Sequence, residues 1–174
     1  ARYGENTYSA MVRFFTTAPD IASFEANSTL YTPRIQAMVS FSTYLLGGSV
    51  SQKVNTLLTF LNVPVLRGVI VNTRTTTDWL VSGDGLTPWS QDDIMGQAGF
   101  PETQGLIEPI IIAASEFQTD STTGAYTYSY TPIPDRIEKL AARLTNWVSL
   151  RMTPASEKRI AIIYYNYPPG KSEI

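Results

Sequence analysis

The residues in this sequence that are best suited to chemistry are carboxylates. Glu102 and Glu108 stand on either side of a glycine turn at Gly105, and Glu108 opens an apolar run typical of a buried strand. Such a turn could direct both side chains into one cavity, where carboxylates act as general bases or as oxygen ligands of a hard metal ion. The alternative is structural: Glu102 solvates a loop, and Glu108 caps or pairs with a nearby arginine.

A second candidate site combines an acidic residue with an aromatic ring, Asp78 and Trp79. Trp79 could stack on a planar ligand while Asp78 or Arg74 meets the polar rim of that ligand. In the competing interpretation, Trp79 and Leu80 form the buried face of a short helix.

A third candidate lies near the end of the sequence, where the strand-like residues 159–165 lead into a Pro/Gly turn. A parallel strand followed by such a turn delivers a loop to the carboxyl edge of a sheet, where α/β proteins bind ligands. Tyr165 and Tyr167 would share one face, and Lys171 could bind a ligand carboxylate or simply be solvated. The Gly-Lys-Ser sequence around Lys171 does not make a phosphate-binding loop, because that motif requires a glycine where Tyr165 stands and a helix afterwards.

The composition excludes several kinds of site. The chain has no cysteine and no histidine, which rules out thiolate and imidazole metal sites, a Ser-His-Asp triad and a cysteine nucleophile. Thirteen basic and fifteen acidic residues are scattered singly, so we expect no nucleic acid partner. No apolar stretch is long enough for a membrane span and no secretion signal is present, so we expect a cytoplasmic protein. Because the first residues are neither a signal peptide nor an initiator methionine, we expect an excised or processed piece of a larger chain.

The periodicity of the apolar residues predicts the elements that position these candidates. Strands are expected over residues 36–41, 65–71, 108–115 and 159–165, with residues 125–130 as an antiparallel partner. Helices are expected over residues 51–62, 73–82, 90–98 and 134–151. We expect Ser49 or Ser51 to cap the first of these helices, and the apolar stripe of the last to pack across the sheet. Residues 1–174 are therefore predicted to form a single α/β domain, with three layers and a mainly parallel sheet flanked by helices, of Rossmann-like or flavodoxin-like type.

Four segments occur in an order and at spacings that match one protein family over about residues 35–174. The segments are FLNVPVL at 60–66, TTTDWL and GLTP within 75–88, PETQGLIEPI at 101–110 and NYPPGK at 166–171. The third looks like the family's P-E-x-x-G-x-I/M-E-P segment, and the fourth looks like its N/S-Y/F-P-P-x-K turn. On these motifs the sequence resembles the large subunits of the ATP-dependent metal chelatases of tetrapyrrole synthesis, the cobaltochelatases and their magnesium chelatase relatives.

The resemblance implies a parent enzyme that binds a tetrapyrrole and a metal ion and forms metal–nitrogen bonds. Separate ATPase subunits of the AAA+ type would supply energy from Mg-ATP, with cobalt or magnesium as a substrate and no cofactor in this fragment. Metal insertion removes two pyrrole protons and strips water from the ion, which makes Glu102 and Glu108 the catalytic candidates. The substrate-binding candidates are Asp78, Trp79, Tyr167 and Lys171.

Two expectations follow about the metal and about the fragment. Cobalt insertion into a corrin precursor in cobalamin biosynthesis is preferred, because the turn at 166–169 looks closer to the cobaltochelatases. The alternatives are a magnesium chelatase large subunit, or a non-catalytic α/β scaffold or small-ligand-binding module. The fragment alone should be inactive, with one wall of the tetrapyrrole site at the carboxyl edge of the sheet, where Trp79 and Tyr167 should be exposed.

Overall fold

A four-stranded sheet with the strand order β1-β2-β3-β4 lies at the centre of the molecule. The computed structural model describes residues 3–82 and 94–163. The strands are β1 (Met38–Ser40), β2 (Val65–Val71), β3 (Leu106–Thr119) and β4 (Tyr126–Pro132). The first three are parallel, and β4 pairs antiparallel with β3. The parallel strands follow their order in the chain, as in one half of a Rossmann sheet.

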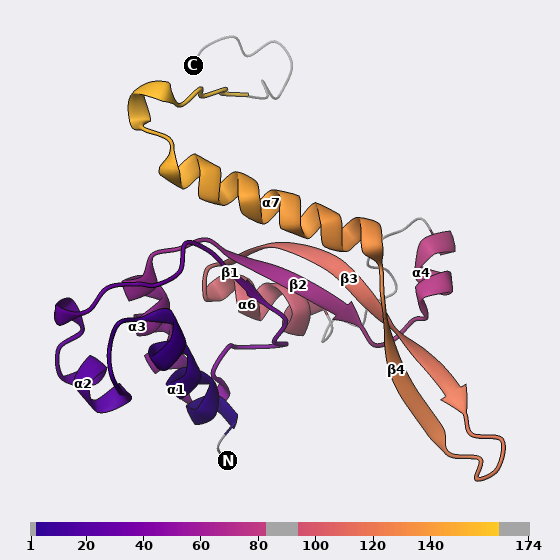
Figure 1. Ribbon diagram of the computed structural model, residues 1–174. Helices are drawn as coiled ribbons and strands as arrows, with labels where there is room; N and C mark the ends of the chain where they lie inside the picture. The colour runs from indigo at the N-terminus through magenta and orange to yellow at the C-terminus, as the bar shows by residue number, and fades with distance from the viewer. Residues whose placement is uncertain (1–2, 83–93, 164–174) are drawn as a thin grey trace, which may run out of the picture.

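Helices cover both faces of this sheet. They are α1 (Tyr3–Phe15), α2 (Ile21–Ala26), α3 (Ser51–Leu61), α4 (Thr76–Ser82), α6 (Phe100–Thr103) and α7 (Pro134–Met152). Shorter helical turns are η1 (Ser28–Leu30), η2 (Gly48–Val50), the π-helix η3 (Met95–Gly99) and η4 (Ala155–Glu157). Figure 1 shows α7 across one face of the sheet, with α1, α3 and α6 on the other side. The predicted three-layer α/β fold with a mainly parallel sheet is confirmed.

The two faces of the sheet have different apolar cores. On the side of α3, the periodic residues Val54, Leu57 and Leu61 are buried together with Val65 and other residues of the sheet edge. Each fully buried aliphatic side chain of this kind contributes roughly 1.5–3 kcal/mol. On the side of α7, a smaller cluster forms around three buried residues from β2, β3 and the helix. They are Leu66, Ile110 and Leu140.

Strand β3 is irregular where it pairs with β2. The register between the two strands shifts between Leu66 and Gly68, and again before Ile70. At the first shift β3 carries an extra residue, and Glu108 there has φ 50°, in the left-handed region that non-glycine residues seldom adopt. Pro109 follows, and it has no N–H to donate to the ladder. A bulge bends a strand and re-aims a side chain, and here that side chain is Glu108.

The second half of β3 and β4 extend from the sheet as a two-stranded arm (Figure 1). Phe117 lies opposite Tyr128 in the ladder, and their rings make an edge-to-face contact with centroids 5.2 Å apart. Tyr126, Tyr128 and Tyr130 are 60–72% exposed. The antiparallel pairing predicted for residues 125–130 is confirmed.

Several predicted boundaries are corrected by the structure. The helix expected over residues 90–98 lies partly outside the described residues, and its described part continues through η3 and α6 to Thr103. Neither Ser49 nor Ser51 caps α3, because η2 leads directly into the helix and makes Val50 the N-cap residue. In α7 the apolar stripe is only partly covered, since Leu140 is buried whereas Ile137 remains exposed.

The strand predicted over residues 159–165 is wrong for the part that the structure describes. Residues 159–163 form no strand, and Ile160, Ile162 and Ile163 are 85–95% exposed. After α7 the chain turns at Pro154 and η4 and runs away from the sheet (Figure 1). A strand requires a neighbouring edge to pair with, which no local pattern of side chains can supply. Residues 164 and 165 lie outside the described residues.

Candidate functional site

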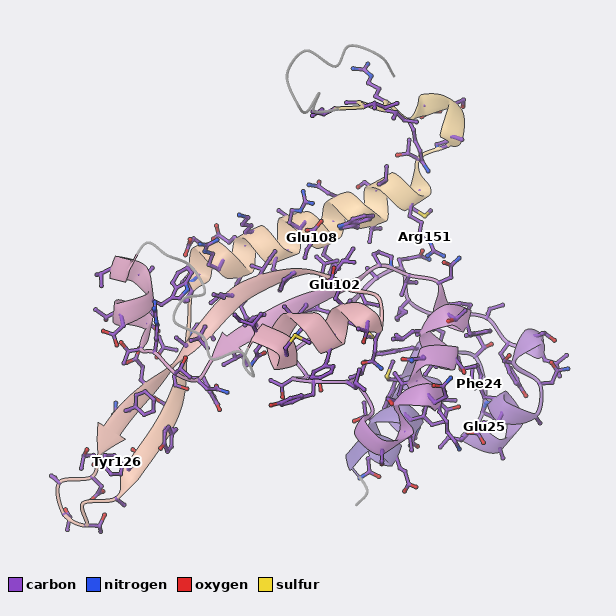
Figure 2. All side chains as sticks on the ribbon, turned by 180° about the vertical axis from the view of Figure 1, so that it is seen from behind. Phe24, Glu25, Glu102, Glu108, Tyr126 and Arg151 are labelled. Atoms are coloured by element: carbon purple, nitrogen blue, oxygen red, sulfur yellow. The ribbon has the colours of Figure 1, made fainter. Side chains whose placement is uncertain are left out.

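Glu102 and Glu108 reach the same small cavity at the amino end of β3. Glu102 lies in α6, and Gly105, with φ 83°, turns the chain from this helix into the strand. The cavity has a volume of about 120 Å³, and its lining includes both glutamates and Arg67 of β2. Figure 2 shows Glu102 near α6 and Glu108 on the side of β3 that faces α7. The structure therefore brings the two carboxylate residues to one cavity, while their chemical roles stay a prediction.

The carboxylate of Glu108 is held by two side chains of α7. Nε of Arg143 donates to Oε2 at 2.6 Å, Nη2 of Arg143 donates to Oε1, and Nε1 of Trp147 donates to Oε1 at 2.8 Å. The hydrogen bond from Arg143, as the largest cause, and that from Trp147 lower the pKa of Glu108, while desolvation opposes them. A carboxylate stabilised in its charged form is a weak base. The arginine pairing that the sequence left open for Glu108 is thus present.

Glu102 differs from Glu108 in its surroundings. It is exposed, and its carboxylate has no hydrogen bond or ion pair with any residue in 3–82 or 94–163. Its helix begins at the π-helix η3, with Pro101 buried in the first turn, so the backbone under Glu102 is fixed. Of the two glutamates, Glu102 is the one whose lone pairs are available to a ligand.

Arg67 is a charged residue that sequence reasoning did not single out. It is 1% exposed in the middle of β2, and the desolvation caused by this burial lowers the pKa of its guanidinium to about 10. Nε donates to the carbonyl of Gln97 at 3.1 Å and Nη1 to the carbonyl of Ser40 at 3.1 Å. Nη1 also donates to the carbonyl of Gly68, and Nη2 to the side-chain oxygen of Gln97. No carboxylate pairs with Arg67 in the described part of the chain, so its charge faces the cavity uncompensated.

The π-helix supplies half of the acceptors for Arg67. Gln97 lies within η3, is buried, and offers both its backbone carbonyl and its side-chain oxygen. Gly96 allows the ring of Tyr44 to lie close, since a Cβ at this position would stand 3.1 Å from that ring. π-Helical turns are rare and often occur at functional sites. The signal available in the sequence was a single arginine inside the apolar run VLRGVIV of β2.

Asp78 and Trp79 are placed at the other end of the sheet. Trp79 is 6% exposed and packs with Val69, Val71 and neighbouring residues, and the guanidinium of Arg136 lies 4.8 Å from the centre of a Trp79 ring. The expectation that Trp79 is exposed at a ligand wall is therefore wrong. Asp78 accepts a hydrogen bond from the hydroxyl of Thr75 at 2.8 Å, and the Thr75 hydroxyl in turn accepts from the Asp78 N–H. Asp78 thus belongs to the start of α4, where the Thr75 hydroxyl accepts from its N–H as an N-cap side chain does.

The predicted site residues are consequently not brought together as one group. Asp78 and Trp79 follow the carboxyl end of β2, whereas Glu102 and Glu108 flank the amino end of β3. Leu80, expected to be buried with Trp79, is exposed. Tyr167 and Lys171 lie outside the described residues.

Comparison with known proteins shows to which family the chain belongs. A family model described as CobN/magnesium chelatase matches residues 4–174. The chain belongs to the CobN/magnesium chelatase family. No solved structure matches the chain. This CobN/magnesium chelatase chain is 30% identical over 146 residues to the chloroplastic magnesium-chelatase subunit ChlH of Oryza sativa subsp. indica, a match that covers 82% of the chain and 10% of that protein.

Two further relatives match shorter parts of the chain. An uncharacterized protein of Methanocaldococcus jannaschii, MJ0908, is 38% identical over 114 residues, 66% of this chain and 9% of that protein. A magnesium-chelatase subunit of Rhodobacter capsulatus is 26% identical over 119 residues, 63% of this chain and 10% of that protein. The chain thus spans about a tenth of the length of these relatives. Two of the three are magnesium chelatase subunits, so they give no support to the expected preference for cobalt.

Two kinds of feature are absent from the described residues of this CobN/magnesium chelatase chain. Within 3–82 and 94–163 no three acidic side chains converge in a way that could hold a metal ion. None of the helices there has the length and apolar character needed to cross a membrane.

Proposed function

We propose that this chain is part of the large subunit of a metal chelatase, which holds a tetrapyrrole while a metal ion is inserted. The observation that carries the proposal is the approach of Glu102 and Glu108 to one cavity, in a chain of the CobN/magnesium chelatase family. Magnesium fits at least as well as cobalt, because the named relatives include magnesium chelatase subunits. The metal ion is a substrate of the reaction in either case.

The two glutamates have different roles in this proposal. Insertion of a divalent ion releases two pyrrole protons, which a base next to the macrocycle must accept. Glu102 is exposed and unpaired among the described residues, so it is the proposed proton acceptor. Glu108 is tied to Arg143 and has a lowered pKa, so it is a positioning residue that fixes the bulge beside Glu102. Arg67 adds a buried positive charge to the wall of the same cavity.

In this proposal, partner proteins supply the energy for metal insertion. Partner subunits of the AAA+ type would bind and hydrolyse Mg-ATP, as the resemblance implies. The substrate-binding roles of Tyr167 and Lys171 remain part of the proposal, whereas Asp78 and Trp79 are reassigned to the structure of α4 and its core.

The test is chelation by the complete subunit with its partners. Glu102→Gln keeps the shape of the side chain but removes its basicity, so the chelation rate should fall by about 10²- to 10⁴-fold. Tetrapyrrole affinity and thermal stability should stay close to those of the unmodified subunit. Glu138→Gln, an exposed change on α7, is the matched control. An unchanged rate in Glu102→Gln would assign Glu102 to structure and favour a scaffold role for this domain.

A further inference from the structure

A separate cavity of about 340 Å³ lies between the last turns of α7 and the segment that joins α3 to β2. This volume falls at the lower end of the range for small-molecule sites. Its apolar lining comes from both sides of the cavity and consists of Val63, Pro64, Ile107, Trp147 and Leu150. Trp147 and Ile107 are partly buried against the α7 side of the sheet, whereas Leu150 is exposed. These five apolar residues form the floor of the cavity, and this floor is open to a ligand.

Apart from Asn62, the polar part of the same lining is cationic. Arg151 and Lys158 both contribute to it, and no carboxylate from residues 3–82 or 94–163 does. Within the described residues neither cation has an ion-pair partner. Arg151 donates from Nη1 to the carbonyl of Asn62, which holds its guanidinium at the rim. Two positive charges beside an apolar floor are complementary to an anion that carries an apolar group.

We propose that this cavity binds a small amphipathic carboxylate, with a ring-sized apolar group on the floor and the carboxylate between Arg151 and Lys158. The indole of Trp147 offers a flat surface to the ring. The guanidinium and the ammonium each offer charge-assisted hydrogen bonds to the carboxylate. The proposal does not depend on the catalytic role of Glu102, and its test uses no chelation assay.

Trp147 reports on occupancy because it has a second contact. Its ring lines the cavity, while its Nε1–H donates to Oε1 of Glu108 at 2.8 Å. Glu108 is already neutralised by Arg143, so it does not repel an anion in the cavity strongly. A ligand that stacks on the indole changes the environment of the Nε1–H, and this proton can be followed directly.

The experiment is an NMR titration of the ¹⁵N-labelled 174-residue chain with 3-phenylpropionate. We expect saturable shifts of the Trp147 indole N–H and of the backbone amides of Val63 and Leu150. The neutral 3-phenylpropionamide should bind about tenfold more weakly, because it loses the charge-assisted hydrogen bonds. Propionate, which has no ring, should cause no saturable shift. Equal affinity for the acid and its amide would overturn the proposal.

Substitutions of the two cations test where the carboxylate of the ligand binds. Arg151→Met and Lys158→Met should each weaken binding of 3-phenylpropionate by about three- to tenfold. Lys139→Met, an exposed cation of α7 that is not part of the lining, should leave the affinity unchanged. All three side chains are exposed, and an amide spectrum of each variant verifies that its fold is intact. Unchanged affinity in both Arg151→Met and Lys158→Met, or shifts that map away from Trp147, would refute the proposed site.

Discussion

Arg143 of α7 binds the carboxylate of Glu108 through two of its nitrogens, and so joins the helical layer to the bulge of β3. The pair fixes a residue whose backbone is in the left-handed region, at φ 50°. Such a conformation costs of order 1–3 kcal/mol and persists only where surrounding contacts determine it. Arg143 and Trp147 are the contacts that do so at Glu108.

Breaking this pair should destabilise the fold moderately. Arg143→Met leaves the Glu108 carboxylate with only the hydrogen bond from Trp147, and we expect the chain to unfold at a lower urea concentration. The effect should be small because solvent weakens an ion pair whose two partners are partly exposed. Urea denaturation of Arg143→Met beside Lys139→Met measures the effect. Equal stability of the two variants would show that the pair contributes nothing.

The same pair predicts a dependence of stability on pH. Because the pKa of Glu108 is lowered in the folded state, its contribution is complete above the unfolded-state pKa of about 4.3 and is lost as the pH falls through the folded pKa. The difference in unfolding free energy between the unmodified chain and Glu108→Gln should be constant from pH 7 to pH 5 and shrink in more acidic solution. Denaturation curves at several pH values test this, and a difference that grows on acidification would contradict it.

Arg67 should be among the most sensitive positions in the chain. Arg67→Ala leaves the carbonyls of Ser40, Gly68 and Gln97 without their donor and opens a void in the sheet layer. We expect a loss of about 3–5 kcal/mol in unfolding free energy. Arg67→Met leaves the same carbonyls without their donor but fills most of the volume, so it should lose less than Arg67→Ala. A loss below about 1 kcal/mol in Arg67→Ala would mean that the burial of Arg67 is not maintained in solution.

Trp79 should behave as a core residue. Trp79→Ala removes a large buried ring from the cluster with Val69 and Val71, and a loss of about 3–5 kcal/mol is expected. Trp79→Phe should cost less, since a ring remains under Arg136. Leu80→Ala, at an exposed neighbouring position, is the control and should change the melting temperature little. If Trp79→Ala kept its full stability, the ligand-stacking interpretation would have to be restored.

The exposed isoleucines after α7 should promote self-association. Ile160 and Ile162 lie within an apolar run that pairs with no strand among the described residues. Changing both to Lys should reduce light scattering at high concentration and leave the melting temperature nearly unchanged, because no buried contact is lost. Ile111→Lys, in the buried core of β3, should unfold the chain and serves as the contrast. A clearly lower melting temperature in the Ile160/Ile162 variant would show that these residues are paired in solution.

The sequence was informative where local patterns decide the outcome. The apolar spacing of Val54, Leu57 and Leu61 predicts α3, and the mostly apolar run of β2 predicts a strand. Local patterns predict the structure poorly where it depends on a partner that is distant in the sequence. Residues 159–163 have the composition of a strand but no described edge beside them. From the sequence, Trp79 is open to two interpretations, a ligand platform or the buried face of a short helix, and the packing of its ring places it in the core.

The candidate site shows the same division. The glycine turn between Glu102 and Glu108 suggests that both reach one cavity, and both residues belong to the lining of the cavity at the amino end of β3. What the sequence could not provide is the partners of Glu108 and Arg67. Arg143 is 35 positions from Glu108, and apart from the neighbouring Gly68 the acceptors of Arg67 come from β1 and the π-helix. These contacts depend on tertiary packing. They determine that Glu108 is bound by side chains of α7, whereas Glu102 remains available to a ligand.

The two bulges of β3 have opposite effects on which face of the strand a side chain occupies, so that the second cancels the first. Each adds one unpaired position, so residues of odd number before the first bulge share a face with residues of even number after it. The second bulge restores the original parity before the arm with Tyr128 begins. A single insertion or deletion between Ile107 and Ala113 would therefore turn the aromatic face of the arm to the opposite side. Length changes in this strand can preserve both the α7 contact and the arm only when they come in twos.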